Sequence, residues 1–367
     1  MKKKLVSVLM CMAMGATLLA GCGSEEAADS SNTTAADAAD ADTAADSEAA
    51  DASDAADAAD AADGDVIKIG FAQVGHESDW RTASTNSAQS IFSAENGYDL
   101  QFVDCDQDSA VQLEAVRGFI EQDVDYIIID PIVSTGWDTV LTECEEAGIP
   151  VIVIDRTIDD SDKYISWVGS NFKNEGLAAG EWLKAYTDAK GISDVNVLVI
   201  EGTTGASAQI GRTDGFKEIA DANGWNILDS QTGDFTQAGG QEVMESYIKS
   251  YEGQFNVVVC QNDNEAYGAM DAMDAAGITY GVDGDVTLIS FDATHDGLQY
   301  TLDGKINCDV ECNPIQAEVV KGVIEKMQAG EEFEKTTLVE DQAFVAPGIE
   351  SEYATTMTDE VLAGRAY

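Results

Sequence analysis

Side chains able to bind a small polar molecule follow several apolar runs of this 367-residue chain. Trp80 and Arg81 come shortly after the run Ile67–Phe71, and Asp155 and Arg156 come directly after another. Tryptophan offers a flat apolar face, and arginine offers a planar fork of five N–H donors. An Asp–Arg pair accepts from and donates to adjacent hydroxyls. These residue types favour a small molecule with hydroxyls and apolar C–H patches, such as a sugar.

The same pattern recurs in the second half of the chain. Asn262 and Asp292 each follow an apolar run. An amide offers a donor and an acceptor, a carboxylate only accepts, and both suit sugar hydroxyls. Ligands of open α/β sheets bind in the crevice beyond the carboxyl ends of the strands. We therefore expect these side chains to face one cleft, and we also expect Asn262 to cap the helix that follows it.

From residue 66 onward, apolar runs of strand length alternate with stretches of helical character. Nearly all-apolar strands indicate parallel sheets covered on both faces. The alternation restarts near residue 171, so the sequence predicts an α/β fold with two Rossmann-like lobes and a cleft between them. The expected strands are Ile67–Phe71, Leu100–Val103, Tyr126–Ile129, Val151–Ile154, Tyr164–Val168, Val195–Ile200, Trp225–Leu228, Phe255–Cys260, Val286–Phe291 and Lys305–Val310. The expected helices are Thr82–Glu95, Ala110–Gln122, Thr135–Ala147, Asn171–Ala189, Ser207–Asn223, Gly239–Tyr251, Asp263–Ala276, Thr294–Asp303 and Pro314–Gln328.

The first 65 residues are predicted to lie outside both lobes. A basic start and an apolar stretch to Leu19 are typical of a signal peptide. The sequence Leu19-Ala20-Gly21-Cys22 resembles the lipobox of bacterial lipoproteins. That resemblance implies cleavage before Cys22, lipidation of its thiol and an anchor on the outer face of the plasma membrane; the alternative is a plain secretory signal. Residues 23–65, rich in Ala and Asp, are predicted to be a disordered acidic tether.

The acidic composition narrows the classes of partner. A net charge of -50 argues against binding nucleic acid or anionic lipid.

The mature fold keeps five cysteines, which are expected to be free thiols, although Cys308 and Cys312 could pair if the backbone permits. No metal or cofactor is expected, because the cysteine spacing is not that of a metal knuckle and the EF-hand-like start at Asp104 lacks the later ligands.

Several motifs at strand ends carry a family resemblance. They are Val74-Gly75 with Ser78, Trp80 and Arg81; Pro131 followed by Thr135-Gly136-Trp137; Gly205-Ala206-Ser207; and Gly233-Asp234-Phe235-Thr236. In this order over about residues 66–330, they resemble the type I periplasmic sugar-binding proteins of ABC transporters. Within that ribose/galactose-binding group, the galactofuranose-binding branch is the nearest likeness.

The resemblance implies a ligand site shared by both lobes and a hinge of three crossing segments. The N-terminal lobe would comprise residues 66–170 and 314–340, and the C-terminal lobe 171–313 and 341–367. The crossings would lie near Gly169–Phe172, Asn313–Pro314 and Asp341–Phe344. Trp80 and Phe235 would cover the apolar faces of the sugar ring. The implied ligand contacts are Ser78, Trp80, Arg81, Asp130, Asp155, Arg156, Ser207, Arg212, Phe235, Asn262, Asp292 and Asn313.

The expected function is capture of a monosaccharide by a monomeric, exported lipoprotein that delivers it to an ABC permease. A sensor lipoprotein that presents the sugar to a membrane receptor is the alternative. A glycoside hydrolase using two of Asp130, Asp155 and Asp292 is disfavoured, because neighbouring Arg or amide groups lower carboxyl pKa values. Pentoses, galactose and a hexofuranose all remain open as ligands.

Overall fold

The computed structural model describes residues 66–349 and 354–367. The predicted signal peptide, Cys22 and the acidic tether therefore lie outside the described residues. Within the described part of the chain, no helix is both long enough and apolar enough to cross a lipid bilayer.

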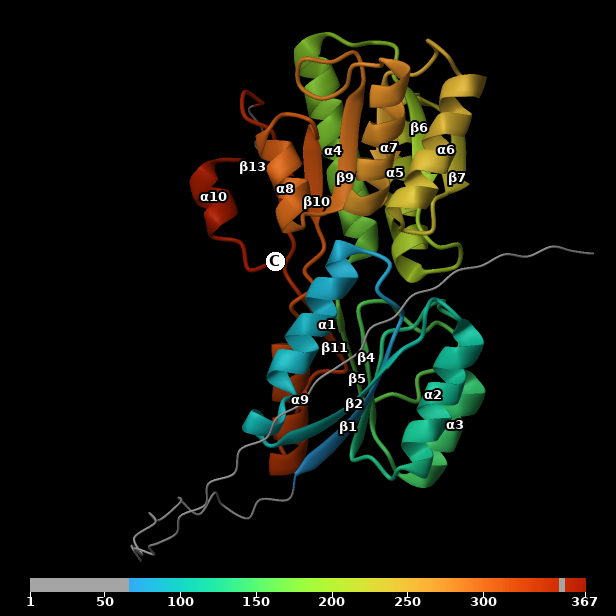
Figure 1. The fold of residues 1–367 in the computed structure, drawn as a ribbon, viewed down its shortest axis with the longest axis vertical. Helices are drawn as coiled ribbons and strands as arrows, with labels where there is room; N and C mark the ends of the chain where they lie inside the picture. The colour runs from blue at the N-terminus through green and yellow to red at the C-terminus, as the bar shows by residue number, and fades with distance from the viewer. Residues whose placement is uncertain (1–65, 350–353) are drawn as a thin grey trace, which may run out of the picture. The chain divides into compact units, whose positions relative to one another are not determined.

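The first lobe is built on a six-stranded, fully parallel sheet with strand order β11-β5-β4-β3-β1-β2 (Figure 1). Its strands are β1 Ile67–Gln73, β2 Tyr98–Asp104, β3 Tyr126–Ile129, β4 Val151–Ile154, β5 Ser166–Gly169 and β11 Thr336–Leu338. Its helices are α1 Asp79–Ile91, α2 Ser109–Glu121, α3 Asp138–Ala147 and α9 Ala317–Ala329, with a 3-10 turn at Ala94–Asn96.

Alternate residues of the central strands explain the three layers of this lobe. Ile127 and Ile129 of β3 pack with α2 and α3, whereas Ile128 packs on the other face with α1 and α9. Gly70 of β1 lies against α2, where a Cβ would come within 2.3 Å of the Phe119 ring. The nearly unbroken apolar strands thus cover both faces of the sheet, as the pattern predicts.

The second lobe is built on a seven-stranded sheet with strand order β13-β12-β10-β9-β8-β6-β7. Its strands are parallel except where β12 runs antiparallel to β10. They are β6 Asn196–Glu201, β7 Asn226–Thr232, β8 Val257–Cys260, β9 Thr287–Asp292, β10 Cys308–Glu311, β12 Ala343–Val345 and β13 Thr355–Thr356. The helices are α4 Phe172–Lys190, α5 Ser207–Asn223, α6 Gln237–Ser250, α7 Asp263–Ala276, α8 His295–Leu302 and α10 Asp359–Ala363.

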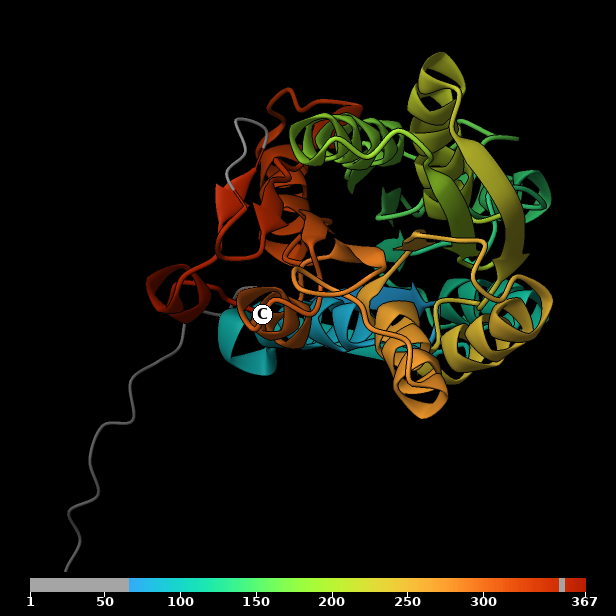
Figure 2. The ribbon, with the colours of Figure 1, turned by 90° about the horizontal axis from the view of Figure 1, so that it is seen from above.

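Helices α4 and α5 cover one face of this sheet, and α6 and α7 cover the other (Figure 2). Glycines let each helix pair approach closely. A Cβ on Gly176 of α4 would come within 2.3 Å of the Arg212 carbonyl on α5, and one on Gly268 within 2.0 Å of the Gln237 carbonyl. This close packing fixes α5, and with it Arg212, against α4.

The chain passes between the two sheets three times, after β5, after β10 and after β11. The predicted α/β class with two parallel-sheet lobes is confirmed.

Some limits of helices and strands differ from the expectation. Helix α1 begins earlier than expected because Ser78 caps it, and α3 begins later because Gly136, at φ 99°, holds a turn before it. The four short elements after residue 335, namely β11, β12, β13 and α10, were not expected from the sequence.

Candidate functional site

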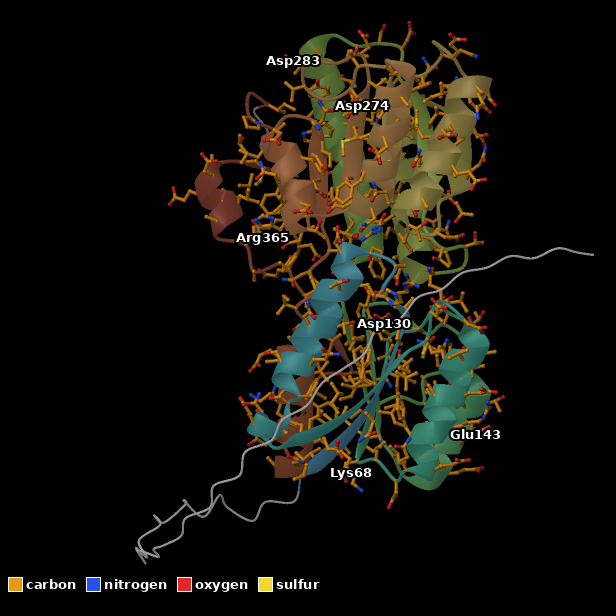
Figure 3. All side chains as sticks on the ribbon, viewed as in Figure 1. Lys68, Asp130, Glu143, Asp274, Asp283 and Arg365 are labelled. Atoms are coloured by element: carbon orange, nitrogen blue, oxygen red, sulfur yellow. The ribbon has the colours of Figure 1, made fainter. Side chains whose placement is uncertain are left out.

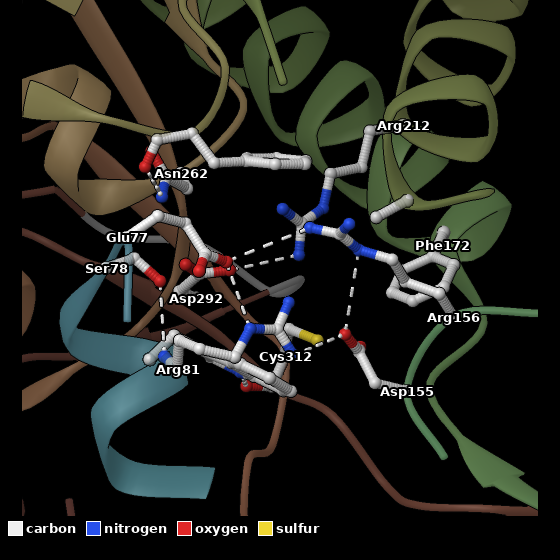
Figure 4. A pocket seen from close by; sticks show the side chains of 13 residues that line it. Glu77, Ser78, Arg81, Asp155, Arg156, Phe172, Arg212, Asn262, Asp292 and Cys312 are labelled. Carbon is white, nitrogen blue, oxygen red and sulfur yellow. Dashed lines mark hydrogen bonds and ion pairs between the residues drawn. The ribbon is translucent and has the colours of Figure 1, made fainter. Parts of the chain in front are cut away.

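A narrow cavity lies between residues of the two lobes (Figure 4). The first lobe provides part of its lining from the β1–α1 turn, the start of α1 and the end of β4; the second lobe provides the rest. The lining residues are Glu77, Ser78, Trp80, Arg81, Asp155, Arg156, Phe172, Ala208, Arg212, Phe235, Asn262, Asp292 and Cys312.

Arg81 is fixed by carboxylates of the first lobe. Its Nε donates to Glu77 Oε1 at 3.0 Å, and its Nη1 donates to Asp155 Oδ2 at 3.1 Å and to Asp130. The Ser78 hydroxyl accepts from the Arg81 backbone N–H and so caps α1. Burial by itself would raise the pKa of Glu77, but Arg81 and Arg156 outweigh it and lower that pKa. Glu77 is therefore a carboxylate that is part of the cavity wall.

Arg212 has the corresponding role in the second lobe. It lies on α5 with 3% of its side chain exposed, and its Nε donates to Glu175 Oε2 at 2.7 Å. Its Nη2 donates to Asp292 Oδ1 at 3.1 Å, and its Nη1 donates to the Gln261 carbonyl. Each lobe thus contributes an arginine that adjacent carboxylates hold in place.

Each arginine of the cavity also lies over an aromatic ring. The guanidinium carbon is 4.6 Å from the Trp80 ring centre for Arg81, and 5.2 Å from the Phe235 ring centre for Arg156. Arg212 lies 5.7 Å from the Phe172 ring centre. Such stacking is favourable within about 6 Å. The wall therefore alternates flat apolar surfaces with fixed N–H donors.

Backbone strain places several of these side chains. Asp155, Phe235 and Asp292 have φ of 55°, 61° and 104°, in the left-handed region that residues other than glycine rarely adopt. Strain of this kind clusters at functional sites, where the surroundings hold it in place. The Phe235 N–H donates to Glu265 Oε1 at 2.9 Å, and the Asn262 side chain donates to the Phe235 carbonyl at 2.9 Å.

Phe235 also depends on a glycine. A Cβ on Gly202 would come within 1.9 Å of Phe235 Cζ, so only glycine at this position leaves room for the ring. Asn262 serves as helix cap as well, because its side chain accepts from the Glu265 N–H at 2.8 Å. The capping predicted for Asn262 is confirmed.

The site contains more carboxyl groups than guanidinium groups. Three guanidinium groups, of Arg81, Arg156 and Arg212, are in contact with or near the five carboxyl groups of Glu77, Asp130, Asp155, Glu175 and Asp292. Burial raises the pKa of Asp130 and of Asp292 well above the ordinary value, and raises the pKa of Glu175 to about 8, although an arginine opposes each shift. Since three cations neutralise only three carboxylates, proton uptake by the surplus carboxyls favours a neutral site and a neutral ligand.

Of the twelve residues expected at the site, nine line the cavity: Ser78, Trp80, Arg81, Asp155, Arg156, Arg212, Phe235, Asn262 and Asp292. Asp130 lies behind this wall at the end of β3, where it accepts from Arg81 (Figure 3). The Ser207 hydroxyl instead accepts from the Thr157 N–H at 2.8 Å, across the two lobes. Asn313 lies in the second crossing, where its side chain accepts from the Ile315 N–H at 2.9 Å.

The sequence-based site omitted four lining residues, Glu77, Phe172, Ala208 and Cys312. Glu77 comes just before the helix start that carries Trp80 and Arg81, so its position was a usable signal. Phe172 and Cys312 lie at crossings between the lobes, and Cys312 accepts a hydrogen bond from the Trp80 indole N–H through its carbonyl. The sequence gives no sign that these two reach the cavity.

The thiol of Cys312 is free, as are those of Cys105, Cys144, Cys260 and Cys308, so the free-thiol expectation is confirmed.

Comparison with known proteins agrees with this architecture. Residues 69–330 match the periplasmic binding protein domain. The galactofuranose-binding protein YtfQ of Escherichia coli (strain K12) is 39% identical over 285 residues, which cover 76% of this chain and 88% of that protein. A solved Mycobacterium smegmatis structure in complex with β-D-fucofuranose is 44% identical with a TM-score of 0.72, covering 76% of this chain and 91% of that one.

A third relative is the periplasmic binding component of the arabinose ABC transporter of Shewanella sp. ANA-3, solved with α- and β-L-arabinofuranose. It is 37% identical with a TM-score of 0.71, and the match covers 76% of this chain and 92% of that one. These relatives are binding proteins and not enzymes, so the hydrolase alternative is set aside. The domain match spans most of the lobed region, and this chain belongs to the periplasmic binding protein family.

Proposed function

We propose that this protein captures a neutral monosaccharide in its furanose form between two closing lobes and delivers it to an ABC permease. The observation that carries the proposal is the cavity itself. Both lobes line it with fixed arginines, carboxylates and aromatic rings. Charge-assisted hydrogen bonds are about twice as strong as neutral ones, so such a wall binds hydroxyls tightly once water is excluded.

The furanose assignment rests on similarity in addition to geometry. The named relatives bind galactofuranose or were solved with fucofuranose and arabinofuranose. Glu77 before α1, Trp80 and Arg81 at the start of α1, and the wall at Phe235 would enclose the sugar ring. The proposed direct contacts are Ser78, Trp80, Arg81, Asp155, Arg156, Arg212, Phe235, Asn262 and Asp292, with Glu77 added from the structure.

Closure would use the three crossings as a hinge, with lobe limits at residues 66–170 plus 314–340 and 171–313 plus 341–367. Direct bonds between the lobes support a closed form. The Asp79 N–H donates to the Asn264 side chain at 3.0 Å, and the Ser134 N–H donates to the Gly205 carbonyl at 3.1 Å. Ser207, bonded to Thr157, acts in this scheme as a closure contact.

Calorimetric titration against a panel of monosaccharides tests the ligand class. We expect tight one-to-one binding of one sugar that populates a furanose form, and 13C NMR of that sugar labelled at its anomeric carbon reads the bound ring form. A pyranose signal in the bound state overturns the furanose assignment. Absence of binding by every sugar in the panel overturns the sugar assignment itself.

We further propose that the chain is exported and held at the outer face of the plasma membrane by a lipid on Cys22. The lipobox-like Leu19-Ala20-Gly21-Cys22 supports this anchor. Expression in a bacterial host with a radiolabelled fatty acid should label the wild-type protein and not the Cys22→Ser variant, and the variant should leave the membrane fraction. Membrane retention of an unlabelled Cys22→Ser protein would refute the anchor.

A further inference from the structure

Two fully buried carboxyl groups lie behind the loop that brings Asp292 into the cavity. Asp263 is the first residue of α7, and Asp309 lies on β10; neither exposes any surface. Their carboxyl groups are neighbours, because they bond consecutive residues of that loop: Asp309 accepts from the Ala293 N–H and Asp263 from the Thr294 N–H. Neither residue lines the cavity, so the proposed ligand contacts do not explain the pair.

The pair holds both residues that follow Asp292. Asp309 Oδ1 accepts from the Ala293 N–H at 3.1 Å. Asp263 Oδ2 accepts from the Thr294 N–H at 2.9 Å and from its hydroxyl at 2.7 Å. The Ser290 hydroxyl, from the strand before the loop, donates to Asp263 Oδ1 at 2.6 Å. The loop is therefore bonded to the two carboxyls on both sides of Asp292.

This loop needs such support because its backbone is strained. Asp292 and Ala293 have φ of 104° and 53°, both in the left-handed region. Strain of this kind costs about 1–3 kcal/mol per residue and persists only where the surroundings hold it. Asp292 in turn bonds Arg212 inside the cavity, so the loop geometry sets where both ligand-facing groups lie.

The surroundings of the pair do not permit two negative charges. The titratable groups that interact with it are Asp292 on β9, Tyr267 on α7 and the thiols of Cys260 and Cys308. Among the described residues no cation forms a salt bridge with either carboxyl, and Arg212 is bonded to Asp292 instead. From α8, Gly297 lies so close that a Cβ would be 2.2 Å from Asp263 Oδ2. Asp309 Oδ2 is buried and accepts from no donor among the described residues. It is the oxygen on which a proton would sit and donate to Asp263.

We propose that Asp263 and Asp309 share one proton and act together as positioning residues that hold Asp292 and its loop in the ligand-binding conformation. Two neighbouring carboxylates that are fully buried cannot both ionise at ordinary cost. Consistently, burial raises the pKa of Asp309 well above its ordinary value and that of Asp263 to about 6. The effect on affinity rests on the proposed sugar-binding function, whereas the shared proton does not depend on it.

The substitution Asp309→Asn distinguishes the role of the shared proton from the role of the side chain's hydrogen bonds. Its oxygen can still accept from the Ala293 N–H, and its amide can donate to Asp263 at any pH. Asp309→Ala removes both bonds. We expect Asp309→Ala to weaken sugar binding at least tenfold near neutral pH, and Asp309→Asn to recover most of that loss. We also expect wild-type affinity to fall at alkaline pH as the pair loses its proton, with a flatter profile for Asp309→Asn.

Infrared spectroscopy of the ligand-free protein near pH 8 tests the proton directly. The wild-type minus Asp309→Asn difference should show loss of a protonated carboxylic acid band, because the other buried carboxyls are common to both proteins. Asp285→Asn is the matched control, since Asp285 is exposed on the same lobe and the difference should show only a carboxylate band. Loss of only a carboxylate band in Asp309→Asn overturns the shared proton.

The affinity measurements test the positioning role separately. Wild-type affinity in a folded Asp309→Ala protein overturns it, and so does an alkaline fall in Asp309→Asn equal to that of the wild type. If Asp309→Ala does not fold, the pH profile of Asp309→Asn still decides the matter. If no sugar binds the wild type, the proposed function fails, while the infrared difference still decides the shared proton.

Discussion

Removal of Arg212 is the sharpest test of the proposed site. Its side chain is almost fully buried and bonds Glu175, Asp292 and the Gln261 carbonyl. Arg212→Met keeps the length and apolar character of the side chain but removes the charge and all three donors. Loss of a hydrogen bond to a charged group costs about 1.5–3 kcal/mol. At about 1.4 kcal/mol per tenfold, sugar affinity should fall by roughly tenfold to 150-fold.

The same substitution should also reduce stability. Breaking a buried ion pair by removing one partner costs about 3–5 kcal/mol. Glu175 would then be left without its cation, and its pKa, already about 8, would rise further. The double variant Glu175→Gln/Arg212→Met removes this orphaned acid. It should regain part of the lost stability without regaining affinity.

Isothermal titration and chemical denaturation of both variants separate the two effects. Arg117→Met is the matched control, because its ion pair with Glu143 at 2.7 Å is exposed and lies between α2 and α3, away from Asp130 (Figure 3). An exposed pair contributes about 0–1 kcal/mol, so affinity should not change. Wild-type affinity in the double variant would show that Arg212 acts only on folding, and the contact assignment would be wrong.

Two further substitutions probe the wall and the hinge. Gly202→Ala pushes a methyl group into the Phe235 ring, so we expect weaker sugar binding and a stability loss of about 1–3 kcal/mol. The control is Gly322→Ala, which lies in open space within α9 and should stabilise the protein by about 1 kcal/mol. Equal melting temperatures for the two variants would refute this expectation. Burial raises the pKa of Asp341, which accepts from Ser170 at 3.1 Å, from 3.8 to about 6. Its protonated form therefore stabilises the fold below about pH 4, and this contribution is lost as pH rises through about 6. Asp341→Asn should be more stable than wild type at pH 7 to 8 and lack this pH dependence; parallel denaturation curves against pH would contradict the assignment.

The sequence alone determined the α/β class, the two parallel-sheet lobes and most strands and helices. It could do so because apolar periodicity and helix signals are local properties, as the capping by Asn262 shows. It also predicted that polar residues after the strands face one cavity, because parallel strands direct their carboxyl ends to one edge. That reasoning reached six of the lining residues: Trp80, Arg81, Asp155, Arg156, Asn262 and Asp292. Ser78, Arg212 and Phe235 were expected only from the family resemblance.

Only the tertiary structure decided which way the individual side chains point. Ser207 bonds Thr157 of the other lobe, whereas Glu77, unassigned from the sequence, lines the cavity. Cys312 reaches the site because a crossing segment passes beneath Trp80 and accepts its indole N–H. Side-chain direction in a loop depends on φ values and on partners distant in sequence, such as the Asp263–Asp309 pair behind Asp292. No sequence periodicity encodes those contacts, because they form only when the strands of a lobe pack against each other and against the segments that cross between the lobes.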